Sequence, residues 1–146
     1  MPRIERSATV SWDGNVSRGS GTISGDTGAF TGLPYTLASR IGNPEGKTSP
    51  EELLAAATAG CFTTSLGSEL VRDGTPAGRL EIGCTIVMDE VPDEGHQIVG
   101  ARIRVHAEVD GASDEGLAAA IERADQGCPF STLLRKAGAS IEVERV

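Results

Sequence analysis

The feature that most constrains the fold of this sequence is one long helix with a well-defined start. Ser49 can accept hydrogen bonds from the first free N–H groups, Pro50 suits the first helical position, and Glu52 completes a capping box. The small and apolar run that follows predicts a helix over 50–72. The Asp-Gly pair at 73–74 is a suitable helix end.

Nearly every face of the first half of this helix is apolar or small. Leu53 and Leu54 are followed by four alanines, and then by Cys61 and Phe62. This pattern is typical of a helix that is buried on all sides. A chain of 146 residues has little protein with which to surround such a helix, so we expect a second copy of the chain to cover it in a homodimer.

Strands and turns flank the long helix on both sides. Turn-forming residues separate the predicted elements, and a chain of this length is one ordinary domain. The order of elements predicts an α+β fold, a single domain over 1–146 with antiparallel sheets and a long buried central helix. The predicted strands are 7–12, 20–24, an extended piece at 33–41, 80–88, 98–109 and 139–146, and the predicted shorter helices are 113–126 and 128–138.

Composition excludes several classes of protein. The formal charge of −8 argues against nucleic-acid binding, which requires a basic surface. No apolar run is long enough for a membrane span. The first ten residues, MPRIERSATV, lack the apolar core of a signal peptide, so we expect a cytoplasmic protein.

The three cysteines are the candidates for chemistry. They form an odd set without C-x-x-C spacing, and only two histidines accompany them, so neither a disulfide scaffold nor a metal site is expected. Cys84 lies on the apolar face of a predicted strand and is interpreted as a core residue. Cys61 lies within the long helix and taken alone is also consistent with a core cysteine, but Gly60 beside it favours a special role, because mid-helix glycine usually serves packing or access.

Cys128 differs because it precedes Pro129 at a predicted helix start. Free N–H groups and the positive end of the helix dipole lower the pKa of a thiol at that position. A purely structural role remains an equal alternative. If the fold brings Cys61 and Cys128 together, one thiol could be oxidised and the other could resolve it as a disulfide.

Two segments resemble the OsmC/Ohr family of hydroperoxide reductases. They are SPEELLAAATAGCF at 49–62 and GCPFS at 127–131. SWDGN at 11–15, GSGTIS at 19–24 and PYTLASR at 34–40 resemble the OsmC branch of the family. The resemblance covers nearly the whole chain and implies the OsmC-like fold as an intertwined homodimer.

The resemblance also implies residue roles. Cys61 matches the peroxidatic cysteine of the family and Cys128 the resolving one. Arg40 matches the arginine that stabilises the thiolate, and Glu51 the glutamate that holds this arginine. In the Ohr branch the arginine comes from farther upstream, and Arg18 is then the candidate.

The implied activity is reduction of organic hydroperoxides to alcohols, with hydrogen peroxide as a further candidate substrate. The family uses no bound cofactor or metal, and a lipoyl-type external dithiol or lipoylated protein restores the thiols. A non-catalytic binding dimer and a thiol redox sensor of the same fold are the alternatives. A trapped disulfide without turnover would favour the sensor.

One geometric expectation concerns the dimer. Glu51 and Cys61 are ten residues apart, which is about 15 Å along a straight helix. An arginine that contacts both within one subunit would be stretched. We therefore expect Arg40 and Glu51 of one chain to serve Cys61 of the other.

Overall fold

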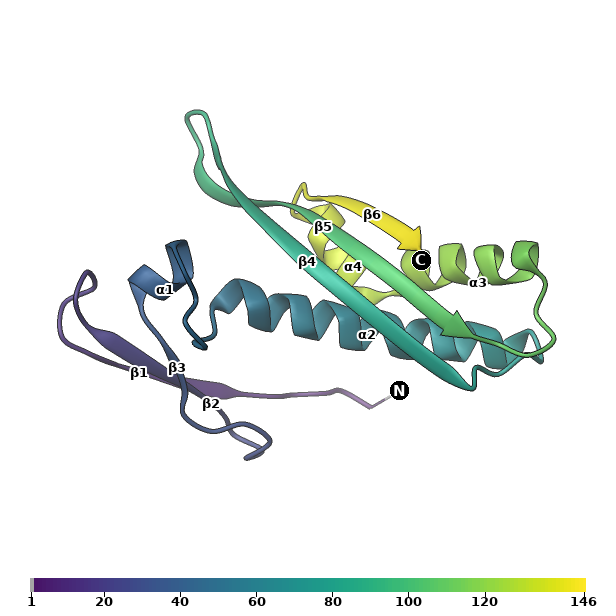
Figure 1. Ribbon diagram of the computed structural model, residues 1–146, viewed down its shortest axis with the longest axis horizontal. Coiled ribbons are helices and arrows are strands. Elements are labelled where there is room, and N and C mark those ends of the chain that lie inside the picture. Colours follow the sequence, from purple (N-terminus) through teal and green to yellow (C-terminus); the bar gives the residue numbers. More distant parts are fainter. Residues whose placement is uncertain (1) are drawn as a thin grey trace. The chain divides into compact units, whose positions relative to one another are not determined.

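The computed structural model describes residues 2–146 and has the predicted α+β architecture (Figure 1). The chain forms two compact units, the first ending at Pro50 and the second running from Glu51 to Val146. The first unit holds an antiparallel sheet in the order β1-β2-β3 and a short helix. Its elements are β1 (Ala8–Asp13), β2 (Ser20–Gly25), β3 (Leu33–Tyr35) and α1 (Leu37–Ile41).

The helix α1 corrects the extended piece predicted over 33–41. Only Leu33–Tyr35 is a strand, and the chain then turns into a helix at Thr36. The Thr36 side chain accepts from the N–H of Ser39, and the Ser39 hydroxyl accepts from the N–H of Thr36, both at 3.0 Å. This reciprocal capping box satisfies N–H groups that a helix start leaves free, and it places Arg40 on α1.

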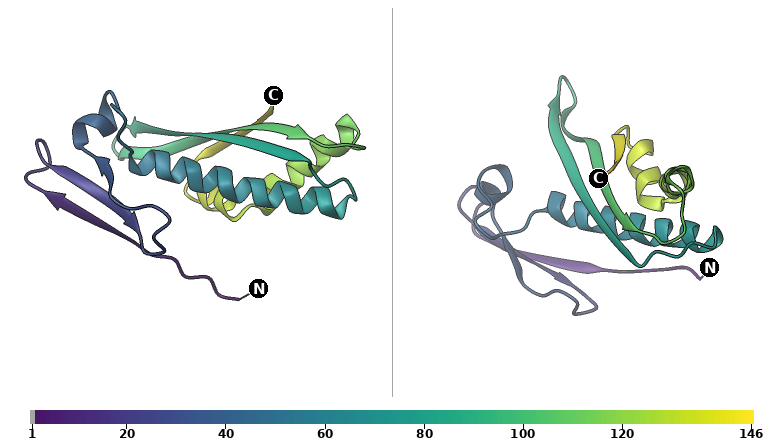
Figure 2. Two further views of the ribbon diagram at one scale, coloured as in Figure 1. Left: turned by 60° about the horizontal axis from the view of Figure 1, so that its bottom comes forward. Right: turned by 45° about the vertical axis from the view of Figure 1, so that its right-hand side comes forward.

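The second unit contains the long helix and a second three-stranded sheet, in the order β4-β5-β6. The predicted bounds of the long helix, 50–72, are confirmed. In Figure 2 this helix runs along one face of the sheet. The elements are α2 (Pro50–Arg72), β4 (Arg79–Val91), β5 (Gly95–Glu108), α3 (Asp114–Gly127), α4 (Pro129–Lys136) and β6 (Ser140–Arg145).

One strand pairing in this sheet differs from the antiparallel sheets expected. β4 and β5 form an antiparallel hairpin, but β6 pairs with β5 in parallel. The reason is the connection between them, because α3 and α4 carry the chain back to the end of the sheet at which β5 begins. β6 therefore enters the sheet by a helical crossover.

The core of the second unit lies between α2, α3 and the sheet. Phe62, Leu66 and Leu70 of α2 are fully buried and cluster with Ile103 and Val105 of β5. Together with Thr58 these α2 residues follow a four-residue spacing, so only one stripe of the helix is buried within the chain. The expectation of a helix buried on all sides therefore does not hold for a single chain.

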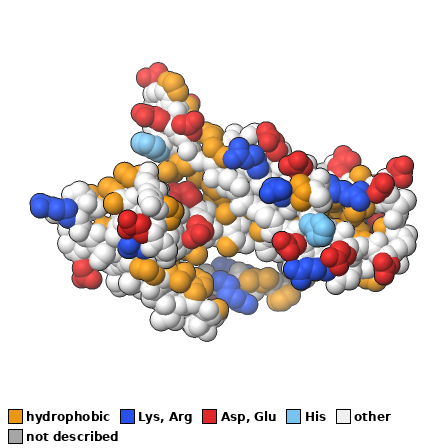
Figure 3. Space-filling model, in the orientation of Figure 1, with side chains coloured by type: hydrophobic (Ala, Val, Ile, Leu, Met, Phe, Trp, Pro, Cys, Tyr) orange, Lys and Arg blue, Asp and Glu red, His pale blue; other side chains and the backbone are white. Residues whose placement is uncertain are grey.

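The β4–β5 hairpin extends beyond this core. Its tip carries the exposed carboxylates Asp89, Glu90, Asp93 and Glu94, and the acidic side chains are visible on the projecting loop in Figure 3. Within residues 2–146, no helix has the length and apolar character needed to cross a membrane.

Candidate active site

Cys61 lies on α2, one residue before the fully buried Phe62. Its side chain is half-buried and packs against the main core cluster. Gly60 next to it is exposed, and a Cβ atom added there would meet nothing within 4 Å. Within the described chain, the helix surface beside Cys61 is therefore open and made of small groups.

Cys128 lies at the junction of two helices, as the sequence predicts. It ends α3 with an extended backbone (φ −71°, ψ 118°) and serves as the N-cap of α4, in which Pro129 is the first residue. Its side chain is completely buried within the main core cluster. The junction thus aims a sulfur at the free N–H groups of the first turn of α4.

Ion pairs hold this junction in place. Arg123 of α3 contacts Glu69 of α2 at 2.8 Å (Nε to Oε2) and Asp73 at 2.6 Å (Nη2 to Oδ2). Arg135 of α4 pairs with Asp125 of α3. These contacts connect α2 to α3 and α3 to α4, the three elements on which the relative position of the two cysteines depends.

The fold brings Cys61 and Cys128 into contact. Each thiol is close enough to the other to change its pKa, although the residues lie far apart in the sequence. The remaining neighbours in the main cluster are mainly aliphatic and aromatic side chains. The two thiols are therefore close together, as the formation of a Cys61–Cys128 disulfide would require.

The two thiols have opposite tendencies to ionise. Burial raises the pKa of Cys61. The N–H of Phe130 opposes this rise, and the neighbouring Cys128 adds to it. Burial also works against ionisation of Cys128. Its pKa is nevertheless lowered, by the N–H of Ser131, the Cys61 thiol, the Ser131 hydroxyl and the N–H of Phe130. Within the second unit, ionisation is therefore easier for Cys128 than for Cys61.

Ser131 is a residue of this site that the sequence reasoning missed. Its side chain is fully buried, its hydroxyl meets no hydrogen-bond partner among the described residues, and it acts to lower the pKa of the neighbouring Cys128. Ser131 is the third residue of α4, the position from which a side chain reaches back to the N-cap. A serine three residues after a cysteine at a predicted helix start is the sequence pattern from which its role could have been predicted.

Cys84 does not belong to this pair. It lies half-buried on β4 and packs against both hydrophobic clusters of the second unit. Burial raises the pKa of its thiol. These surroundings agree with the interpretation of Cys84 as a core residue.

The other predicted site residues come from other parts of the chain than the cysteine pair. Glu51 lies in the first turn of α2, and because the helix is continuous, it is about 15 Å from Cys61 along the axis. Arg40 is an exposed residue of α1, and Arg18 lies between β1 and β2, both in the first unit. Within residues 2–146, no three His, Cys, Asp or Glu side chains are grouped as metal ligands.

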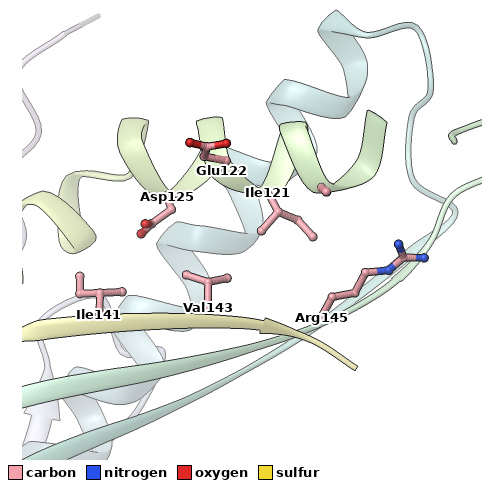
Figure 4. Close-up of a pocket in the computed structure, with 7 residues that line it drawn as sticks. Ile121, Glu122, Asp125, Ile141, Val143 and Arg145 are labelled. Carbon is pink, nitrogen blue, oxygen red and sulfur yellow. The ribbon is translucent and has the colours of Figure 1, made fainter. Parts of the chain in front are cut away.

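A cavity of ≈380 Å³ between α3 and β6 holds none of the predicted site residues. Ile121, Ile141 and Val143 form its apolar walls, and Glu122 and Asp125 lie on the helix side (Figure 4). None of the three cysteines lines this cavity.

Comparisons with known proteins identify the family of this chain. The model of the OsmC-like protein family matches residues 42–144, and the chain belongs to this family. Peroxiredoxin OsmC of Escherichia coli K12 is 30% identical over 132 residues, which cover 90% of this chain and 91% of that protein. The resemblance seen in the sequence is therefore confirmed.

Solved structures confirm the fold. The organic hydroperoxide resistance protein OhrB of Bacillus subtilis superposes with a TM-score of 0.74 at 22% identity, covering 96% of this chain and 98% of that one. An OsmC-like protein of unknown function from Vibrio cholerae gives a TM-score of 0.78 at 16% identity, covering 99% and 100%.

Proposed function

We propose that this protein is a thiol peroxidase that reduces organic hydroperoxides with Cys61 as nucleophile and Cys128 as resolving thiol. The observation that carries the proposal is the pair of neighbouring thiols, one of them completely buried, which share one core cluster and change each other's pKa. The names of the relatives, a peroxiredoxin and an organic hydroperoxide resistance protein, support the substrate class.

Three balanced steps make up the proposed cycle. The Cys61 thiolate attacks the O–O bond of the hydroperoxide, which leaves a sulfenic acid on Cys61 and releases an alkoxide that takes up a proton to form the alcohol. The Cys128 thiol then condenses with the sulfenic acid, forming a disulfide and water. An external dithiol, of the lipoyl type in the family, reduces the disulfide by exchange and becomes a cyclic disulfide itself.

The first step requires a cation close to Cys61. The groups of the second unit raise the pKa of Cys61, so they do not by themselves supply its thiolate. Arg40 is our candidate because a guanidinium stays charged, favours thiolate over thiol and can polarise the peroxide. Glu51 would orient it by a bidentate contact. Arg18 is the alternative source of the cation.

A homodimer is the arrangement that we propose for this step, with Arg40 and Glu51 of one chain at Cys61 of its partner. Glu51 and Cys61 of one chain are about 15 Å apart on the same helix, too far for one guanidinium to serve both closely. Ala56, Gly60 and Thr64 form an exposed strip of small residues at four-residue spacing on α2. Such a strip lets a second helix approach closely.

The proposal needs no bound metal, flavin or haem, because the thiols carry both electrons of the reduction. The partners are the hydroperoxide, the dithiol reductant and a second copy of the chain. We propose the cytoplasm as its location, where reducing dithiols keep the pair in the thiol form between turnovers.

The test is peroxide consumption by the purified protein with dihydrolipoamide, comparing cumene hydroperoxide with hydrogen peroxide. Cys61→Ser should abolish consumption and dimedone labelling of the sulfenic acid. Cys128→Ser should keep one turnover and lose the dithiol-driven cycle. Cys84→Ser is the matched control and should consume peroxide at the wild-type rate.

Three outcomes would contradict the proposal. Consumption that persists in Cys61→Ser would exclude Cys61 as the nucleophile, and dimedone labelling that moves to Cys128 would reverse the two roles. A disulfide that forms without turnover on any dithiol would replace the enzyme with a redox sensor.

A further inference from the structure

The cavity between α3 and β6 is not accounted for by the proposed peroxidase chemistry. Its volume of ≈380 Å³ lies within the roughly 300–1,000 Å³ of small-molecule pockets. All of its lining residues belong to the second unit, so the cavity is complete within that unit. No residue of the proposed catalytic cycle is among them.

Two elements supply apolar walls that face each other. Ile121 lies on α3, and Ile141 and Val143 lie two residues apart on β6, so both point to the same side of the strand. Figure 4 shows these three side chains pointing into the space between the helix and the strand. Ala118, three residues before Ile121, is the smallest side chain of the lining. The cavity thus offers aliphatic contacts to an apolar body.

Two of the charged side chains in the lining already have partners of opposite charge outside it. Arg145 pairs with Asp114 at 3.0 Å (Nη1 to Oδ1), and Oδ2 of Asp125 pairs with Arg135. Figure 4 shows Asp125 and Arg145 at opposite ends of the lining. The charges of these two residues are therefore balanced within the chain.

Glu122 is the charged lining residue whose charge is not balanced in this way. Its side chain is exposed and forms no ion pair within residues 2–146, and its Oε1 accepts a hydrogen bond from the neutral amide of Gln126 at 3.3 Å. Glu122 also lies towards the C-terminal end of α3, where the helix dipole is negative, and the last turn of α3 has no basic residue. This end of the cavity therefore attracts a cation.

Asp125 strengthens the same preference through its second oxygen. While Oδ2 pairs with Arg135, Oδ1 is buried and meets no hydrogen-bond donor in the described part of the chain. A carboxylate oxygen without a donor is costly to bury, and the low dielectric around it strengthens its attraction for a cation. Glu122 and Asp125 lie three residues apart on one helix, so both carboxylates act on the same end of the cavity.

We infer that the cavity binds a small amphipathic primary amine, with its ammonium group at Glu122 and Asp125 and its apolar body against Ile121, Ile141 and Val143. An ammonium group has three N–H donors, enough for both carboxylates. The volume lies at the lower end of the range for ligand pockets, which suits an alkyl chain of medium length.

This ligand is independent of the proposed catalytic cycle. It has neither a peroxide bond nor a thiol, so it is neither substrate nor reductant. Arg135 keeps Oδ2 of Asp125 when the ligand is bound, so the ion pair between α3 and α4 is retained. Binding therefore does not depend on the role of Cys61.

The test is isothermal titration calorimetry of the reduced full chain with n-octylammonium chloride at neutral pH. Octanol has the same chain without the charge and should bind about tenfold more weakly, because a charge-assisted hydrogen bond is stronger than a neutral one. Sodium octanoate carries the opposite charge and should bind more weakly than octanol. Amide chemical shifts should change mainly in α3 and β6. Cys61→Ser should bind octylammonium as the wild type does, which separates this test from that of the peroxidase.

Matched variants test the two parts of the site. Glu122→Gln should lose most of the preference for octylammonium over octanol, and Glu122→Asp should retain part of it. Glu115→Gln removes the same charge from α3 outside the cavity and should leave the preference unchanged. Ala118→Leu fills the cavity and should weaken both ligands, whereas Ala119→Leu adds the same side chain outside the lining and should not. Both alanines are exposed, so neither change should prevent folding.

Each of the following results would overturn the inference. Equal affinity for octylammonium and octanol would show an apolar cavity that does not recognise a cation. Tighter binding of octanoate would show that Arg145 rather than Glu122 sets the preference. Absence of both binding heat and shift changes, with protein shown by circular dichroism to be folded, would show that the amine does not enter. Binding that Ala118→Leu leaves unchanged would place the ligand elsewhere on the molecule.

Discussion

The two units of this chain bury very different amounts of apolar side chain. In the second unit Phe62, Leu66, Leu70 and Ile103 are completely inaccessible to solvent, whereas in the described part of the first unit Ile23 is the one large aliphatic side chain that is buried. The first unit also leaves Val10 52% exposed. The cysteine pair thus lies in the part with a strong core, and the candidate arginine in the part with a weak one.

This difference in burial indicates that the two units suit different tasks, one requiring fixed geometry and the other requiring mobility. Two thiols that must meet repeatedly at one distance need the close packing of a real core. A side chain that must reach a ligand or a partner benefits from a unit held mainly by strand pairing and turns. The predictions below test this division, in order of decreasing effect.

The largest expected effect is that of oxidation on the second unit. A Cys61–Cys128 disulfide closes a loop that lies entirely in this unit, and restricting the unfolded chain in this way stabilises by about 4 kcal/mol. Chemical denaturation of oxidised and reduced protein should show this difference, and hydrogen exchange should place the added protection after residue 50. Equal protection of β1–β3 would show that the two units unfold together.

A core truncation should separate the units by stability. Leu66→Ala in the second unit should lower the free energy of unfolding by roughly 3 kcal/mol, because it leaves a cavity among completely buried neighbours. Val10→Ala in the first unit removes exposed surface and should change it by less than about 0.5 kcal/mol. Urea denaturation measures both, and comparable losses would contradict the contrast in burial.

Removal of the proposed cation should change reactivity rather than stability. Without the guanidinium, burial and Cys128 hold the pKa of Cys61 high, so Arg40→Gln should lower its thiolate fraction at neutral pH. Peroxide consumption at pH 7 should fall about tenfold, which corresponds to one unit of pKa, and should recover as the pH rises. Arg40→Lys should recover part of the rate. An unchanged pH profile would exclude Arg40 and direct attention to Arg18.

The smallest effect concerns Ser131. Ser131→Ala removes one of the groups that lower the pKa of Cys128, so this pKa should rise. Alkylation of Cys128 by iodoacetamide, measured in a Cys61→Ser background after mild opening of the core, should slow by about threefold below the alkaline range. Ser131→Thr keeps the hydroxyl and serves as the control. A rate that Ser131→Ala leaves unchanged would show that the hydroxyl does not reach the sulfur.

The low pKa of Cys128 also predicts how stability depends on pH. A group whose pKa is lower in the folded state has lost its proton while the unfolded chain still holds it, so stability rises with pH between the two pKa values. The raised pKa of Cys61 acts in the opposite direction above the ordinary thiol pKa. Reduced protein should therefore be most stable at mildly alkaline pH, which denaturation at a series of pH values measures. In Cys128→Ser the rise should disappear.

Local signals made much of the second unit predictable. The cap at Ser49 and Pro50 gave the start of α2, and Cys128-Pro129 gave the start of α4, because these residues act on neighbours within one turn. The alternation of apolar and polar residues along the chain predicted β4 and β5. The two cysteines of the site could be named from the amino-acid sequence because the resemblance to the family covered both motifs.

Other features were beyond such reasoning because they depend on distant parts of the chain. α1 has five residues, too few for a helical period, and Pro34 favoured an extended reading. The parallel pairing of β6 depends on where two helices return the chain. The contact of the Trp12 and Tyr35 rings over Gly21 requires the register of three strands, which no local pattern fixes.

Cys128 is both the C-cap of α3 and the N-cap of α4, so a change in its oxidation state acts directly on the junction between the two helices. The N–H groups of Ser131 and Phe130 lower the pKa of Cys128, and a sulfur in a disulfide carries no charge for them to stabilise. Oxidation would then tie α4 to α2 through a covalent bond while loosening its first turn. The rate of amide hydrogen exchange at Phe130 and Ser131 would therefore report whether Cys61 and Cys128 are reduced or joined in a disulfide, without any added dye or substrate.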